Sequence, residues 1–213
     1  IGEIGMSHLL REASRNAIYR HGGTKYRVQR IVKGEGIVRL VREVSRNETV
    51  AFVRKTLVLR KRLKGTDFPG LQISVGVLEI SEYLESLTEK EPSGKTLRTW
   101  PRPGGLPPYR LKTEGVLIIP RASASTTKVA AESAERLLAG LFPTIVGPCD
   151  PQDYSSGIMT TGEGDTAIVL YDSAHGGIGL TEAAYRRTSE LVDHALERVQ
   201  SCQCETDAGC IRC

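Results

Sequence analysis

Four cysteines lie within the last twelve residues of the chain, and no other sequence feature restricts its folding as strongly. They form two close pairs, Cys202-Gln-Cys204 and Cys210-Ile-Arg-Cys213, joined by a short segment that ends in Gly209. A glycine at that point permits the tight backbone that brings two thiol pairs together. Four thiolates can hold one Zn²⁺ tetrahedrally, at about 2.3 Å from each sulfur. The spacing therefore predicts a zinc site with Cys202, Cys204, Cys210 and Cys213 as ligands.

Two disulfides or four free thiols are the alternatives for this cluster. Disulfides are typical of secreted proteins, whereas residues 1–5 lack the basic flank and apolar core of a signal peptide. No apolar run approaches the roughly 20 residues that a membrane span requires. We therefore expect a cytoplasmic protein. The absence of an initiator Met suggests a fragment of a longer chain. A four-cysteine site has no open coordination position, so its metal is expected to be structural.

The first two thirds of the chain have the alternating pattern of short strands. Polar and apolar residues alternate over 24–31 and most clearly over 71–77, and further strand-like runs cover 37–41, 49–54 and 56–60. Short strands separated by Gly and Asn predict an antiparallel meander or a small barrel. Residues 91–108 hold five of the ten prolines, and we expect a loop or linker there.

Helical periodicity appears only in the last third. It follows a strand over 115–119, and we expect a helix from Lys128 to about Leu141, ended by Pro143. A buried strand over 167–171 precedes a second helix, over 181–200. The predicted class is α+β, in which a basic β-rich domain (1–110) precedes an α/β zinc-binding subdomain (111–213) that ends in a four-cysteine knuckle.

Basic residues are concentrated in the first third of the chain. Residues 11–64 hold 16 Lys and Arg against 4 Asp and Glu, while the whole chain carries a net charge of only +4. Such an asymmetry is typical of a surface that binds a polyanion, although a solvated sheet with outward Arg and Lys gives the same composition. Our candidates for contacts with DNA phosphates are Arg27, Arg30, Arg54, Lys55, Arg60, Lys61 and Arg62.

Two glycine-containing segments resemble phosphate sites. Ser93-Gly94-Lys95-Thr96 imitates the end of a nucleotide-binding loop, but Glu89 stands where that motif needs glycine. We therefore expect no ATPase function from it. The turn from Asp172 to Gly179 joins a strand to a helix, where backbone N–H groups can bind an anion. A tight structural connection is the alternative that we favour, since Asp172 would repel a phosphate.

Several segments resemble the C-terminal region of superfamily 2 DNA helicases of the mitomycin repair factor A type. They occur in the family's order and span nearly the whole chain. The resemblance is strongest in the last third. They are Ile1-Gly2-Glu3-Ile4, residues 17–28, Leu111 to Val116, Asp150-Pro151-Gln152-Asp153, Leu170-Tyr171-Asp172, Gly176 to Leu180, Cys202-x-Cys204 and Gly209-Cys210-x-x-Cys213.

The resemblance implies a zinc-binding domain that braces a helicase motor and shapes the path of single-stranded DNA. In that family two RecA-like domains precede this region and drive 3′-to-5′ movement on DNA, commonly in repair. We expect this chain to be the non-motor accessory part and not an enzyme by itself. The alternative is a motor-less protein-interaction subunit of a defence or repair complex.

Overall fold

The computed structural model describes residues 2–32, 34–103, 106–121, 128–204 and 210. The chain divides into two compact units that share one long hairpin. The first unit comprises Ile1–Thr56 and Ser81–Arg110, and the second comprises Leu57–Ile80 and Leu111–Cys213. The hairpin consists of β4 (Glu48–Phe68) and β5 (Leu71–Lys90), so each unit contains part of both strands.

The first unit is built around a small antiparallel meander. After α1 (Met6–Glu12), β1 (Ile18–His21), β2 (Thr24–Val32) and β3 (Ile37–Arg42) pair in the order β1-β2-β3. Val28 of β2 and Leu87 of β5 are fully buried and form a core with Ala17. Trp100 of β6 (Thr96–Pro101), which pairs with β5, packs against this core.

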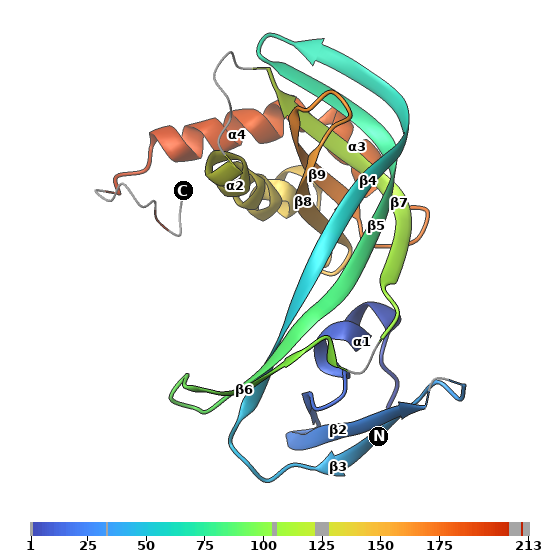
Figure 1. Cartoon of the computed structure of the whole chain (residues 1–213). Helices are drawn as coiled ribbons and strands as arrows, with labels where there is room; N and C mark the ends of the chain where they lie inside the picture. The colour runs from blue at the N-terminus through green and yellow to red at the C-terminus, as the bar shows by residue number, and fades with distance from the viewer. Residues whose placement is uncertain (1, 33, 104–105, 122–127, 205–209, 211–213) are drawn as a thin grey trace. The chain divides into compact units, whose positions relative to one another are not determined.

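The second unit is a sheet covered by helices (Figure 1). Its strands are the hairpin tip of β4 and β5, then β7 (Tyr109–Pro120), β8 (Tyr154–Thr160) and β9 (Thr166–Asp172). The order is β4-β5-β7-β9-β8, and β9 runs antiparallel to both of its neighbours. α2 (Lys128–Val146) contacts β8 and β9, and it also contacts α3 (Leu180–Arg186) and α4 (Thr188–Gln200).

The core of the second unit explains why its helices lie there. Apolar side chains of α2 and α4 meet those of the central strands, and all are almost completely buried. None of the described helices combines the length and apolar composition that a membrane-spanning helix needs. The core residues include Phe142, Leu138, Leu191, Ala195, Val116 and Leu170.

The predicted α+β class is confirmed, with a meander in the first unit. The strand-like runs 49–54 and 56–60 are confirmed as strand, and both belong to one 21-residue strand, β4. Other local predictions were wrong. The proline-rich segment 91–108 contains β6, whose residues pair with β5 from Ser86 to Lys90. The helix predicted over 181–200 is two helices separated at Arg187.

The break at Arg187 has a local cause. The Thr188 hydroxyl donates a 2.7 Å hydrogen bond to the Ala184 carbonyl oxygen, an acceptor within the preceding turn. Such back-bonding by a β-branched hydroxyl residue bends helices. The Arg187 N–H also bonds to that carbonyl in the tighter i−3 geometry, at 3.1 Å. These contacts end α3 and reorient the chain into α4.

Pro143 lies inside α2 and does not end it, contrary to the prediction. Proline lacks an N–H and leaves the carbonyl four residues earlier without its helical donor. That carbonyl belongs to Ala139, and the Tyr154 hydroxyl donates a 3.2 Å hydrogen bond to it. The Tyr154 ring stacks on Phe142, with ring centroids 4.6 Å apart. A side chain from β8 thus supplies the missing donor, and the helix continues to Val146.

Candidate metal centre

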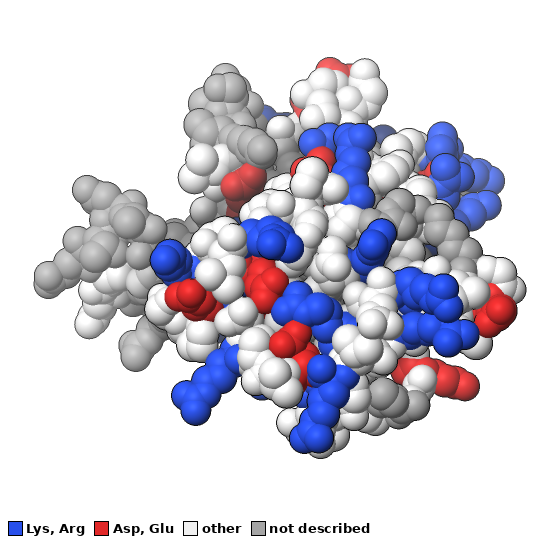
Figure 2. Space-filling view, turned by 60° about the horizontal axis from the view of Figure 1, so that its bottom comes forward, with Lys and Arg blue, Asp and Glu red and all other residues white. Residues whose placement is uncertain are grey.

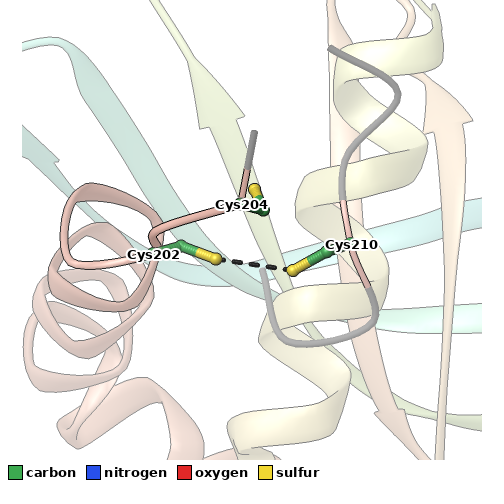
Figure 3. Close-up of side chains that lie close together, drawn as sticks. All are labelled: Cys202, Cys204 and Cys210. Carbon is green, nitrogen blue, oxygen red and sulfur yellow. Dashed lines mark hydrogen bonds between the residues drawn. The ribbon is translucent and has the colours of Figure 1, made fainter. Parts of the chain in front are cut away.

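The chain leaves α4 directly into the cysteine cluster. Cys202, Cys204 and Cys210 place their sulfur atoms within 4.8 Å of one another. Figure 3 shows the Cys202 and Cys210 side chains pointing toward each other, with Cys204 beside them. Cys213, the fourth predicted ligand, and Gly209 lie outside the described residues. The structure therefore brings three of the four predicted ligands together.

The spacing of these sulfur atoms fits zinc and does not fit a disulfide. Cys202 Sγ and Cys210 Sγ are 3.4 Å apart, far longer than the roughly 2.05 Å of an S–S bond. Two sulfurs bound to one tetrahedral Zn²⁺ are about 3.8 Å apart, given a zinc–sulfur distance of about 2.3 Å. Three thiolates this close repel one another strongly unless a cation lies between them.

The position of the cluster connects it to the core of the second unit. α4 is anchored by Leu191 and Ala195, which are buried against α2 and the sheet. Cys202 follows the last helical residue by two positions, and its N–H bonds to the Val199 carbonyl at 3.4 Å. A metal bound to these thiols would therefore lie directly after the end of a packed helix.

The glycine turn between β9 and α3 is already filled by a protein carboxylate. Asp172 is 1% exposed. Its Oδ2 accepts hydrogen bonds from the N–H groups of Ile178 (2.6 Å) and Gly179 (3.0 Å), and its Oδ1 accepts one from Thr181 N–H (2.9 Å). These are the backbone donors that a phosphate would need. The turn from Asp172 to Gly179 is therefore a tight structural connection, as we favoured.

The segment Ser93-Gly94-Lys95-Thr96 lies at the turn between β5 and β6. Gly94 has φ 85° and its N–H bonds to the Glu91 carbonyl at 2.9 Å. The Glu91 N–H bonds in turn to the Lys95 carbonyl, also at 2.9 Å. These contacts close a hairpin, and no helix follows within it, since β6 begins at Thr96. The segment is a turn of a β-hairpin.

Three of the seven basic candidates, Arg27, Arg54 and Arg60, form salt bridges with carboxylates. Arg54 forms a salt bridge with Glu85, and Arg60 forms one with Glu79. Lys55 is half-buried. On the face drawn in Figure 2, Asp and Glu side chains lie among the Lys and Arg side chains. Among the residues that the structure describes, the predicted candidates that form no salt bridge are Arg30, Lys61 and Arg62, all exposed.

Arg27 stabilises the first unit from within. Its guanidinium binds both carboxylate oxygens of Glu89, at 2.8 and 3.1 Å, and also Glu43, at 2.5 Å. The bond to Glu89 raises the pKa of Arg27 and lowers that of Glu89. The pKa of Glu43 falls to about 2, mainly through the hydrogen bond from the Ser45 backbone N–H and also through Arg27. Arg27 thus forms charge-assisted hydrogen bonds with two carboxylates.

The strand register reveals a basic residue that our sequence analysis missed. Arg30 of β2 lies directly opposite Arg39 of β3, and both side chains are exposed. Like charges directly opposite each other in a sheet destabilise it. A bulge between Val28 and Arg30 shifts the pairing here, so the alternation of the sequence alone does not reveal this pair.

Comparison with known families identifies the zinc-binding part of the chain. Residues 134–213 match the model of the MrfA Zn-binding domain. This match includes most of α2, then β8, β9, α3, α4 and the whole cysteine cluster. The donor set and its geometry fit this metal, so zinc is the cofactor of this domain.

Solved structures extend the similarity in fold to the whole chain. The crystal structure of the DUF1998 helicase MrfA bound to DNA matches 100% of this chain, with a TM-score of 0.74 and 21% identity. A further crystal structure of the DUF1998 helicase MrfA matches with a TM-score of 0.63 and 20% identity. This chain covers 29% and 30% of those chains, so it spans less than a third of their length.

A curated relative matches over a shorter stretch. The ATP-dependent helicase hrq1 of Schizosaccharomyces pombe (strain 972 / ATCC 24843) is 40% identical over 48 residues, which are 22% of this chain and 4% of that protein. Residues 134–213 therefore match the MrfA Zn-binding domain family, and the chain as a whole resembles the corresponding part of MrfA in fold.

Proposed function

We propose that this chain is the non-motor C-terminal accessory region of an ATP-dependent DNA helicase. Zinc braces the end of α4, and the basic surface guides single-stranded DNA. The observation that carries the proposal is the thiol cluster that follows α4. The fold of this chain also matches part of MrfA along the whole length of this chain. The RecA-like motor domains and the 3′-to-5′ movement are assigned to the parent protein, because this chain spans 29% of MrfA.

Four ligands are assigned to the zinc: Cys202, Cys204, Cys210 and Cys213. Three of them are already within 4.8 Å, and Cys213 completes the pattern of two pairs. We place the protein in the cytoplasm, because a cluster of zinc-binding thiols is expected in a reducing compartment. The metal has no catalytic part in this account.

The DNA contacts are assigned first to the Arg30–Arg39 pair. The two residues pair across β2 and β3, and both side chains are exposed and without a salt bridge in the described part of the chain. A row of DNA phosphates offsets the repulsion between them and accepts bidentate hydrogen bonds from each. Lys61 and Arg62, exposed near the tip of β4, are assigned as further phosphate contacts. Such binding is independent of sequence and falls steeply with salt.

The test is the affinity of the zinc-loaded chain for fluorescein-labelled oligo-dT, measured by anisotropy between about 50 and 200 mM salt. Each phosphate contact contributes about 0.7 to the slope of log K against log salt. Replacing both Arg30 and Arg39 by Ala should lower that slope by about 1.4. The matched control removes two exposed basic residues elsewhere, Lys95 and Arg136. Equal losses in the two double variants would remove the assignment to the Arg30–Arg39 pair.

A motor-less interaction subunit is the second candidate, and one observation favours it. Val50 and Phe52 of β4 are 53% and 61% exposed, which is a large apolar exposure for two residues of one strand. A zinc-loaded chain that binds no oligo-dT even at about 50 mM salt would favour this role over the accessory role on DNA.

A further inference from the structure

The first unit contains a cavity that neither the zinc site nor the Arg30–Arg39 pair uses. Its volume is about 530 Å³, within the range of pockets that hold small ligands. Strands β4 and β5 and the segment after β6 provide its lining. The residues that matter here are Arg54, Tyr83, Leu84, Glu85, Arg102 and Pro103.

Two arginines line this cavity. Arg54 and Arg102 both line it, and each presents a planar fork of donors that matches a phosphate group. Glu85 pairs with Arg54 and cancels one of the two charges. The three charged side chains of the lining therefore carry a net charge of +1 when no ligand is bound.

An aromatic ring lies in the same lining. Tyr83 is 41% exposed although its neighbours in β5, Glu82 and Leu84, are buried. Apolar Leu84 and Pro103 complete this part of the wall. An exposed ring beside arginines is the combination with which proteins hold single strands, since bases stack on the ring while cations hold the backbone.

The backbone at Arg102 is strained. Its φ is 42°, in the left-handed region that residues other than Gly, Asn and Asp rarely adopt. Its N–H donates a 2.8 Å hydrogen bond to the Glu85 carbonyl, which holds the strained residue at the cavity. A glycine would adopt this conformation more easily. An unfavourable conformation that places an arginine in a cavity indicates a functional role for its side chain.

We infer that this cavity binds one nucleotide unit of single-stranded DNA, with the phosphate at Arg54 and Arg102 and the base stacked on Tyr83. The inference rests on the proposed function and adds a defined subsite to it. It assigns stacking to Tyr83, whereas the exposed arginines of β2 and β3 contact only phosphates.

Three variants separate binding from folding. Arg102→Gly removes the guanidinium and relieves the backbone, so its thermal stability should equal or exceed that of the wild type. It should bind oligo-dT about fivefold more weakly near 0.1 M salt, since one phosphate contact is lost. Tyr83→Ala should weaken binding by about fivefold or more, whereas Tyr83→Phe should retain it, because stacking needs only the ring. Phe68→Ala is the matched control: Phe68 is 40% exposed and does not line the cavity.

A fourth variant should change binding in the opposite direction. Glu85→Gln frees Arg54 and should tighten oligo-dT binding, by about the factor that Arg102→Gly loses. Glu79→Gln makes the same change of charge on the same strand, at the Arg60 pair outside the cavity. Its effect should be clearly smaller than that of Glu85→Gln.

The experiment is an anisotropy titration of the zinc-loaded 213-residue chain and these variants with oligo-dT, with thymidine monophosphate as competitor. Salt-sensitive binding that Arg102→Gly and Tyr83→Ala weaken, and that Glu85→Gln tightens, supports the subsite. Wild-type binding in all of these variants overturns it and leaves the proposed function intact. Thymidine monophosphate that binds as tightly as oligo-dT also overturns it, because the cavity then serves a free nucleotide. No binding of oligo-dT by the wild type contradicts the proposed function itself.

Discussion

Tyr154 donates a hydrogen bond from its hydroxyl to the carbonyl oxygen of Ala139, the acceptor that Pro143 deprives of its helical donor. Tyr154 belongs to β8 and Ala139 to α2, so the bond joins the proline-containing helix to a strand that it contacts. It allows α2 to extend past a proline and carry Ile145 into the core. The length of α2 thus depends on a residue fifteen positions away in sequence.

The first prediction concerns this bond. Tyr154→Phe keeps the ring stacked on Phe142 but leaves the Ala139 carbonyl without a donor, so it should lower the free energy of unfolding by about 1 kcal/mol. Pro143→Ala supplies a backbone N–H to that carbonyl. In the Pro143→Ala background, Tyr154→Phe should therefore cost close to nothing. Denaturant unfolding of the four proteins measures the coupling, and equal costs in both backgrounds would refute this account of α2.

The second prediction concerns the buried carboxylate at the start of α3. Asp172 accepts four hydrogen bonds, three from backbone N–H groups and one from the Thr181 hydroxyl. Asn has one acceptor oxygen and would turn its amide hydrogens toward some of these donors. Asp172→Asn should therefore destabilise the second unit by about 2 kcal/mol. The control Asp165→Asn changes an exposed residue and should have almost no effect on the unfolding midpoint. A comparable midpoint for the two variants would contradict the role of Asp172.

The third prediction concerns acid stability of the first unit. The pKa of Glu43 falls from 4.5 to about 2 in the folded chain, and that of Glu89 is also lowered. A carboxylate with a lowered pKa stabilises the fold fully above its unfolded pKa and loses this effect as the pH falls through the folded value. The contribution of Glu43 should therefore disappear between about pH 4.5 and pH 2, and it is on the order of 3 kcal/mol.

Glu43→Gln isolates this effect from the release of zinc, which acid also promotes. The difference in unfolding free energy between wild type and variant should be largest near neutral pH and shrink steadily below about pH 4.5. Urea titrations at several pH values measure it. A difference that stays constant down to about pH 3 would mean that Glu43 does not stabilise the fold through its charge.

The fourth prediction concerns the individual cysteines. Cys210→Ser removes one zinc ligand and should lower the melting temperature by at least about 5 °C. Cys149 is the matched control, because it is free, half-buried and outside the cluster. Burial raises the pKa of the Cys149 thiol, so it stays protonated and is unsuited to bind zinc. Cys149→Ser should therefore retain the full zinc content, and a similar loss of zinc in both variants would count against the assigned ligands.

Local patterns made part of the fold predictable from the sequence. The alternation over 24–31 corresponds to β2, which contributes Val28 to the core of the first unit. The apolar run over 167–171 corresponds to β9, which is buried along almost its whole length. The spacing of Cys202, Cys204 and Cys210 was sufficient to predict that they meet. Cysteines so close in sequence need no long-range folding information to approach one another.

Other features were not predictable from local patterns. The continuation of α2 requires the distant residue Tyr154. The break at Arg187 requires a local hydrogen bond of the Thr188 hydroxyl that helical periodicity does not reveal. Composition identified the first third as basic but could not separate Arg27, whose partner Glu89 is 62 residues away, from exposed Arg30. β4 extends into the polar segment 61–68, where periodicity gives no strand signal; there it pairs with β5, and Lys64 and Thr66 also contact α3.

Zinc content tests the central claim most directly. Elemental mass spectrometry of the purified chain, combined with thermal unfolding before and after treatment with a strong chelator, measures both the metal and its structural effect. The account predicts one zinc per chain, and a melting temperature that falls when zinc is removed and recovers when it is restored. A chain without zinc, or one whose melting temperature does not change when zinc is removed, would contradict a structural zinc centre at the end of α4.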